Sequence, residues 1–219
     1  MIIAENIHKF YDNNHILNGI NLNIEEGEIV SLVGASGAGK TTLLQILGTI
    51  DICDKNYSSK LILKNKNINN LNENQLASLR NQEIGFVFQF HQLLPEFNVI
   101  ENICIPAFIN KTSKENAKAK AIELINYLGL KDRAYNKPYE LSGGEKQRVA
   151  IARALINDPS IILADEPSGN LDSSASNNLH ELFNELRKDF KHTFIIATHD
   201  ISLAKKSDRI LKISDGKIK

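Results

Sequence analysis

The stretch from Gly34 to Thr41 has the spacing of a phosphate-binding loop, G-x-x-x-x-G-K-[ST]. Residues 28–33 before it are typical of a buried strand, and residues 42–47 after it are typical of a helix start. Backbone N–H groups of such a loop converge on a phosphate, and the helix dipole favours its negative charge. Lys40 then reaches the β- and γ-phosphate oxygens, and the Thr41 hydroxyl can bind Mg²⁺. The predicted nucleotide-contacting residues are Gly34, Ala35, Ser36, Gly37, Ala38, Gly39, Lys40, Thr41 and Thr42.

A carboxylate pair, Asp165 and Glu166, follows the apolar run 161–164. Open α/β sheets bind their ligands at the carboxyl ends of strands, where this pair would lie. In a phosphate-loop enzyme Asp165 would hold Mg²⁺, directly or through water, and Glu166 would take a proton from the attacking water. The alternative is a plain acidic pair at a strand end, which the glycine-rich loop in the same chain disfavours.

A second anion site is expected at the helix that follows Ser142. Ser142 and Glu145 have the spacing of a capping box, and Gly143 and Gly144 leave backbone N–H groups bare. Two phosphate-binding helix ends far apart in one sequence suggest that they meet across a dimer. The alternative is a helix cap that the two glycines loosen.

The elements that must position these residues follow a parallel α/β pattern. Continuous apolar runs at 84–88, 161–164 and 193–197 predict strands of a parallel sheet. Leu22 and Ile24 alternate with polar neighbours, which predicts a half-buried antiparallel strand near the N-terminus. The helix between the last two strands carries an apolar stripe that predicts core, at Leu179, Leu182, Phe183, Leu186 and Phe190.

Residues 89–153 have a helical pattern and predict an inserted helical subdomain in a single domain of residues 1–219. Segments 1–88 and 154–219 then form the nucleotide-binding α/β core. Within the insert, Thr112–Glu115 has capping-box spacing ahead of a helix that ends near Gly129. The Asn-rich segment 51–74 is interpreted as a surface excursion with one strand at 61–63 and no visible chemistry.

The composition bounds the function. The 219 residues carry 26 basic and 26 acidic side chains, and this balance disfavours nucleic acid as the main partner. Cys53 and Cys104 lie far apart without metal-like spacing, which favours a reducing compartment. Neither a signal peptide nor an apolar run of the ~20 residues that span a membrane is visible. We expect a soluble cytoplasmic protein that reaches a membrane through a partner.

With these motifs in place, the chain resembles the ATP-binding subunits of ABC transporters over nearly its whole length. Leu141–Arg148 is similar to the LSGGQ-type signature of that family, with Glu145 where glutamine is commoner. Ser168-Gly169-Asn170-Leu171-Asp172 resembles its D-loop. The resemblance implies a P-loop NTPase (RecA-like) parallel core, with ATP and Mg²⁺ bound there.

Further roles follow from the resemblance alone. Gln89 lies where the family has its Q-loop glutamine, and His199 where it has the switch histidine that contacts the γ-phosphate. Tyr11 lies where an aromatic ring stacks on adenine, with Phe10 as the alternative. The implied catalytic residues are Glu166, His199, Gln89 and Lys40. The implied Mg²⁺ ligands are Thr41, Gln89 and Asp165.

The resemblance also implies partners. Two copies would close head to tail, so that the phosphate loop of one faces Ser142, Gly143 and Gly144 of the other. The segment 90–102 resembles the lipoprotein-releasing group, with permease partners of the LolC/LolE type and a peripheral location on the cytoplasmic side of the inner membrane. Cell-division (FtsE-like) and macrolide-export ATPases remain alternatives within the same group. Soluble ABC ATPases acting on nucleic acid or the ribosome, and small-molecule kinases, are more distant ones.

Overall fold

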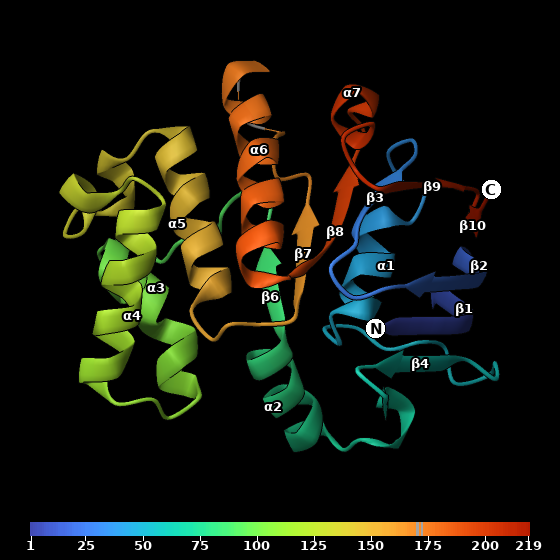
Figure 1. Ribbon diagram of the computed structural model, residues 1–219. Helices are drawn as coiled ribbons and strands as arrows, with labels where there is room; N and C mark the ends of the chain where they lie inside the picture. Colours follow the sequence, from blue (N-terminus) through green and yellow to red (C-terminus); the bar gives the residue numbers. More distant parts are fainter. Residues whose placement is uncertain (170, 172) are drawn as a thin grey trace.

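The computed structural model describes residues 1–169, 171 and 173–219, with the backbone alone at 173 and 174 (Figure 1). The smaller β-sheet consists of β1 (Ile2–Tyr11), β2 (Asn14–Ile24), β4 (Lys60–Leu63) and β5 (Lys66–Asn67). The larger sheet consists of β3 (Ile29–Val33), β6 (Ile84–Val87), β7 (Ile161–Asp165), β8 (Thr193–Thr198), β9 (Arg209–Ser214) and β10 (Lys217–Ile218). The α-helices are α1 (Lys40–Leu47), α2 (Glu73–Glu83), α3 (Val99–Ile109), α4 (Lys114–Tyr127), α5 (Gly143–Leu155), α6 (Ser173–Phe190) and α7 (Ile201–Ala204).

The larger sheet has the strand order β10-β9-β3-β8-β7-β6, and β9, β3, β8, β7 and β6 run parallel. The smaller sheet, of order β2-β1-β4-β5, is antiparallel. Figure 1 shows α3, α4 and α5 gathered on one side of the larger sheet and the smaller sheet on the other. The predicted α/β class, with a parallel sheet and an antiparallel N-terminal element, is confirmed.

The strand register brings the carboxyl ends of the central strands level. The paired residues at these ends are Val33 with Thr198, Ala197 with Asp165, and Ala164 with Val87. The phosphate loop, His199, Glu166 and Gln89 each follow one of these ends within two residues. Residues far apart in the sequence therefore emerge along one edge of the sheet, as open α/β sheets require of a ligand site.

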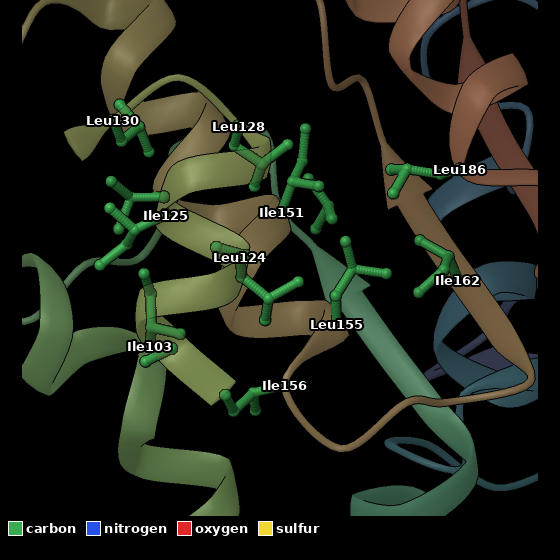
Figure 2. Packing of buried hydrophobic residues seen from close by; sticks show 14 of the residues in the cluster. Ile103, Leu124, Ile125, Leu128, Leu130, Ile151, Leu155, Ile156, Ile162 and Leu186 are labelled. Atoms are coloured by element: carbon green, nitrogen blue, oxygen red, sulfur yellow. The ribbon is translucent and has the colours of Figure 1, made fainter. Parts of the chain in front are cut away.

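Alternate residues of the central strands pack into two cores. Ile162 of β7 lies in a cluster that continues into α3, α4, α5 and α6, whereas its neighbours in the strand pack with α1 and the smaller sheet. Figure 2 shows Ile162 and Leu186 beside Leu155 and Ile151 of α5. The inserted helices thus share one continuous apolar core with one face of the sheet, which fixes where α5 begins relative to the strand ends.

Three local predictions need correction. Residues 51–74 are not only a surface excursion, because β4 pairs with β1 and buries Leu61 and Leu63. Ser113, not Thr112, caps α4, since its side chain accepts the backbone N–H of Asn116. Phe190, at the last residue of α6, is 44% exposed and not part of the core.

The rest of the α6 stripe is confirmed at its centre, where Leu179, Phe183 and Leu186 are buried. The strand at 61–63 is confirmed as β4. Cys53 and Cys104 carry free thiols. In the part of the chain that the structure describes, no helix combines the length and apolar character that a membrane span needs.

Candidate nucleotide-binding site

A cleft of about 440 Å³ opens where the carboxyl ends of β3, β8, β7 and β6 meet. It is lined by Tyr11, Ile16, Ser36, Gly37, Gly39, Lys40, Thr41, Thr42, Gln89, Glu166 and His199. The fold therefore brings together side chains from five separate parts of the sequence. Sequence analysis named all of them except Ile16, whose apolar side chain in β2 carries no motif.

Two glycines of the phosphate loop are required by the backbone geometry. A Cβ at Gly34 would stand 2.3 Å from the carbonyl oxygen of Ile213, so no larger residue fits there. Gly39 has φ of +102°, and a Cβ on it would stand 2.8 Å from Leu17. Gly39 also accepts the Leu43 N–H at 2.9 Å, so the loop turns directly into α1.

Lys40 holds its ammonium inside the loop. Its Nζ donates to the carbonyl oxygens of Gly34 at 2.8 Å and Ala35 at 3.2 Å, and lies 3.8 Å from Glu166 Oε1. The residue is only 7% exposed. A buried cation needs partners, and phosphate oxygens are stronger acceptors for it than neutral carbonyls. The loop thus presents a positive group suited to an anion.

Thr41 and Asp165 form a pair of oxygen ligands at the start of α1 and the end of β7. Thr41 Oγ1 donates to Asp165 Oδ1 at 3.1 Å. Burial raises the pKa of Asp165 and the charge of Glu166 raises it further, while the hydroxyl of Thr41 and the charge of Lys40 oppose the shift. Hydroxyl and carboxylate oxygens are the donors that Mg²⁺ prefers, and a cation would offset the cost of burying this carboxylate.

Glu166 and His199 contact each other across the ends of β7 and β8. The Glu166 Oε2 atom lies 2.8 Å from His199 Nδ1 and accepts the His199 backbone N–H at 3.3 Å. The Glu166 N–H donates to Ala197 O at 2.9 Å, and its backbone is left-handed with φ of +45°. A non-glycine residue rarely adopts this conformation, and such strain gathers at functional sites. The carboxylate is thereby fixed in the cleft.

Tyr11 and Phe10 have different environments. Tyr11 lines the cleft, whereas the Phe10 ring stacks on His15 with centroids 4.0 Å apart. Tyr11 Oη donates to Asp51 Oδ2 at 2.8 Å. Sequence analysis missed this contact because Asp51 belongs to the segment judged to have no chemistry.

The remaining loop residues lie on another side of the loop. Gly34, Ala35 and Ala38 line a hollow beside Ile213 and are absent from the lining of the cleft. They contribute backbone, as a phosphate loop does, and no side chain that reaches the cleft.

Ser142, Gly143 and Gly144 are not among the described residues that line the cleft. The capping box is formed: Ser142 Oγ accepts the Glu145 N–H at 3.2 Å, and Glu145 Oε2 accepts the Ser142 N–H at 2.7 Å. Arg133 Nε donates to Glu145 Oε1 at 2.8 Å, and this bond, with the Ser142 N–H, lowers the pKa of Glu145 to about 2. The D-loop segment 168–172 includes residues 170 and 172, which lie outside the described residues.

Comparison with known proteins identifies the family. A family model described as ABC transporter matches residues 17–169, more than half of the chain. This chain belongs to the ABC transporter family. The ABC cassette fold is also found among solved structures. The dimeric structure of MJ0796, a bacterial ABC transporter cassette, has a TM-score of 0.91 and 38% identity, over 100% of this chain and 97% of that one.

A second structure of MJ0796, in a post-hydrolysis state bound to ADP and Pi, gives a TM-score of 0.90 at 36% identity, over 100% of this chain and 97% of that one. Curated relatives of this ABC transporter protein are named lipoprotein-releasing system ATP-binding protein LolD. The one from Bacteroides fragilis is 54% identical over 100% of both chains. The one from Porphyromonas gingivalis is 52% identical over 99% of this chain and 97% of the relative. The predicted family and fold class are confirmed.

Proposed function

We propose that this chain binds and hydrolyses ATP as the subunit that powers a separate membrane permease in releasing lipoproteins from the inner membrane. The observation that carries the ATPase function is the cleft, where Lys40, Thr41 and the Glu166–His199 pair converge and Asp165 bonds to Thr41 from outside its lining. Full-length similarity to relatives named for lipoprotein release supports the transport role. It disfavours cell division and macrolide export, which those relatives' names do not mention.

In this proposal the triphosphate of ATP lies on the loop amides, and Lys40 exchanges its carbonyl partners for β- and γ-phosphate oxygens. The adenine stacks on Tyr11. Glu166 accepts a proton from the attacking water as the oxygen of that water bonds to the γ-phosphorus. The bond from the γ-phosphorus to the β–γ bridging oxygen breaks, giving ADP and inorganic phosphate. His199 orients Glu166 and contacts the γ-phosphate.

The oxygen donors in the cleft fit Mg²⁺, and Thr41, Asp165 and the Gln89 amide oxygen are its proposed ligands. Held by these residues, Mg²⁺ would neutralise part of the charge on the phosphate oxygens. Asp165 must be deprotonated to act as a ligand, and the charge of a bound cation would favour that state.

Each complete site is proposed to need two copies of the chain. Ser142 and the bare N–H groups of Gly143 and Gly144 would face the γ-phosphate held by the other copy, giving two equal sites about a two-fold axis. ATP then favours the closed pair because only that state makes both sets of contacts. Gln89 lies at the junction between the proposed core (1–88 and 154–219) and the helical subdomain (89–153). It would transmit the closure and opening of the dimer to the permease.

The permease is proposed to dock on the loop after Gln89, with partners of the LolC/LolE type and a peripheral place at the cytoplasmic face of the inner membrane. Phe90, Leu94 and Phe97 of this loop are 71%, 42% and 40% exposed. Fully buried Asn102 bonds the backbone of Leu94 and Phe97 and so holds the loop in shape. A fixed loop that presents apolar side chains suits a partner helix.

Affinity purification of the tagged chain from membranes tests this function. We expect integral subunits of the LolC/LolE type to co-purify, and capture to fall in a Phe90→Ser variant that still hydrolyses ATP. Phe108→Ser, in an equally apolar but distant exposed position at the end of α3, is the matched control. A single FtsX-like partner, or capture that Phe90→Ser leaves unchanged, would contradict the proposal.

A further inference from the structure

We infer that Asp51 and Lys9 are positioning residues that fix the Tyr11 ring at the base end of the cleft. The inference rests on the proposed ATP site, in which Tyr11 stacks on adenine. Lys9 in β1 and Asp51 in the loop after α1 would then help the site to bind a nucleotide in preference to a bare polyphosphate. Neither residue lines the cleft itself.

The three side chains form a closed set of contacts. Asp51 accepts the Tyr11 hydroxyl at 2.8 Å on one oxygen and the Lys9 ammonium at 2.5 Å on the other. Lys9 Nζ also donates to the Ile52 carbonyl at 3.0 Å and lies 5.1 Å from the centroid of the Tyr11 ring. A cation at this distance from a ring is attracted to its face. The ring is therefore held at its hydroxyl and by the nearby ammonium.

Asp51 is itself anchored to the helix that carries the phosphate loop. Its backbone N–H donates to the Gln45 carbonyl in α1 at 3.2 Å, and the Ile50 N–H donates to the same carbonyl at 2.9 Å. The Ile52 N–H donates to Asp51 Oδ1 at 2.7 Å. Because α1 begins at Lys40, one helix sets the position of the phosphate-binding end and, through Asp51, of the aromatic end.

The surrounding charges favour the ionised form of Asp51 and the protonated form of Tyr11, which the bond between these two residues needs. Burial raises the pKa of Asp51, but the hydrogen bonds from Lys9, Tyr11 and Ile52 outweigh it and leave the pKa below its ordinary value. Burial and the Asp51 carboxylate raise the pKa of Tyr11 and outweigh a hydrogen bond from Thr42 that lowers it, so the Tyr11 hydroxyl stays protonated and donates to Asp51. The Lys9 and Asp51 side chains are only 12% and 23% exposed, which makes their bond stronger than a pair in open solvent.

The Tyr11–Asp51 bond should affect ATP binding through the mobility of the Tyr11 ring. Tyr11 is the last residue of β1 and is 43% exposed, so without Asp51 its ring gains rotameric freedom. Stacking a base on it then costs additional conformational entropy, which pre-organisation avoids. Asp51 bonds to Tyr11, Lys9 and Ile52, whereas Lys40 bonds to Gly34 and Ala35 and pairs with Glu166, so loss of Asp51 should leave the phosphate contacts of Lys40 in place. Loss of the Tyr11–Asp51 bond should therefore weaken the binding of ATP and leave the binding of inorganic triphosphate unchanged.

The test compares ATP with inorganic triphosphate, each with Mg²⁺, by calorimetric titration of the full-length chain. We expect Asp51→Ala to raise the Kd for ATP about two- to tenfold, the scale of ordering one freed side chain on binding, and to leave the Kd for triphosphate unchanged. KM for ATP should rise with kcat retained. Glu5→Ala, which breaks the Glu5–Lys60 pair elsewhere on β1, is the matched control and should change neither Kd.

The Tyr11→Phe variant keeps the ring and removes the hydroxyl. With Asp51→Ala and the double variant it completes a double-mutant cycle. Combined with Asp51→Ala it should add less than its effect alone, because both changes cut the Tyr11–Asp51 bond and only Tyr11→Phe also removes the contact with Thr42. Asp51→Asn is the milder variant if Asp51→Ala melts early, and it should give a smaller rise in the Kd for ATP alone. Equal weakening of ATP and triphosphate, additive effects, or unchanged ATP binding would overturn the inference. A wild-type chain that binds triphosphate but not ATP would overturn the proposed function as well.

Discussion

The cleft and the start of α5 are the two proposed anion sites, and in the proposed dimer the start of α5 acts on a nucleotide held by the other copy. In the cleft, side chains from β1, the phosphate loop and the ends of β6, β7 and β8 converge on one space. At the start of α5, Ser142 and Glu145 satisfy each other, and Arg133 donates a charged hydrogen bond to Glu145.

This difference indicates that the cleft and the start of α5 have different roles. The cleft provides a cation, the Glu166 carboxylate and an aromatic ring, with Asp165 bonded to Thr41 beside it, so we expect one chain to bind nucleotide alone. The capping box satisfies the N–H of Ser142 and of Glu145, and the first N–H groups of an α-helix have no carbonyl partner within it, so the two glycine amides would suit a partner's phosphate. Changes in the cleft should therefore alter binding and chemistry, and changes at α5 should alter closure.

The largest effect is expected from Glu166→Gln. Removing the proposed general base should lower ATP turnover by about 10²–10⁴ and leave an ATP-bound dimer. Phosphate release measures the first effect, and size-exclusion chromatography with light scattering measures the second. Hydrolysis near the wild-type rate would show that Glu166 does not act as the base.

A smaller effect, on binding alone, is expected from Lys40→Ala. Losing charged hydrogen bonds to the phosphates should weaken ATP binding by about 10- to 100-fold, and no trapped dimer should form. Lys60→Ala, which removes an ammonium paired with Glu5 away from the cleft, should bind ATP normally. A trapped dimer in Lys40→Ala would mean that the loop is not the phosphate cradle.

The Ser142→Ala variant distinguishes an effect on ATP-driven dimer closure from an effect on the stability of the fold. Ser142 and Ser113 each cap a helix by accepting the backbone N–H three residues on, so each alanine variant should lose about 1 kcal/mol of stability. In a Glu166→Gln background only Ser142→Ala should weaken the ATP-driven dimer, while both variants bind ATP as monomers. Equal dimerisation in the two variants would place the start of α5 outside the shared site.

The smallest effect concerns pH. The folded-state pKa of Glu145 is about 2, below the roughly 4.3 of an unfolded chain, so its contribution to stability is present above pH 4.3 and lost as the pH falls towards 2. Chemical unfolding at pH 6 and pH 3 should show a smaller decline for Glu145→Gln than for the wild type. The same decline in both would show that the capping box does not depend on the charge of Glu145.

The parallel core and most of the cleft could be predicted from the sequence because their signals are local. The strand before Gly34, the carboxylates after 161–164 and the capping box at Ser142 each occupy fewer than ten consecutive residues. The family resemblance supplied Gln89, His199 and Tyr11, which no spacing rule singles out. The sheet register then places these short segments along one edge.

The parts that were missed depend on contacts between distant residues or on burial. Asp51 meets Tyr11 across 40 positions, and no periodicity encodes that approach. Helix α2, which the sequence analysis does not predict, buries only Leu79 among its own residues and so lacks an apolar stripe. Phe190 has the right helical phase for the core but lies at the last residue of α6, so its position in the helix outweighs its phase.

The central claim is that ATP is shared between the phosphate loop of one copy and the start of α5 of another. A crystal structure of the Glu166→Gln chain with ATP and Mg²⁺ tests it most directly. The account predicts each triphosphate between Lys40 of one copy and Ser142 of the other, in two equivalent sites. A triphosphate held by one chain alone, with Ser142 of both copies turned to solvent, would contradict it.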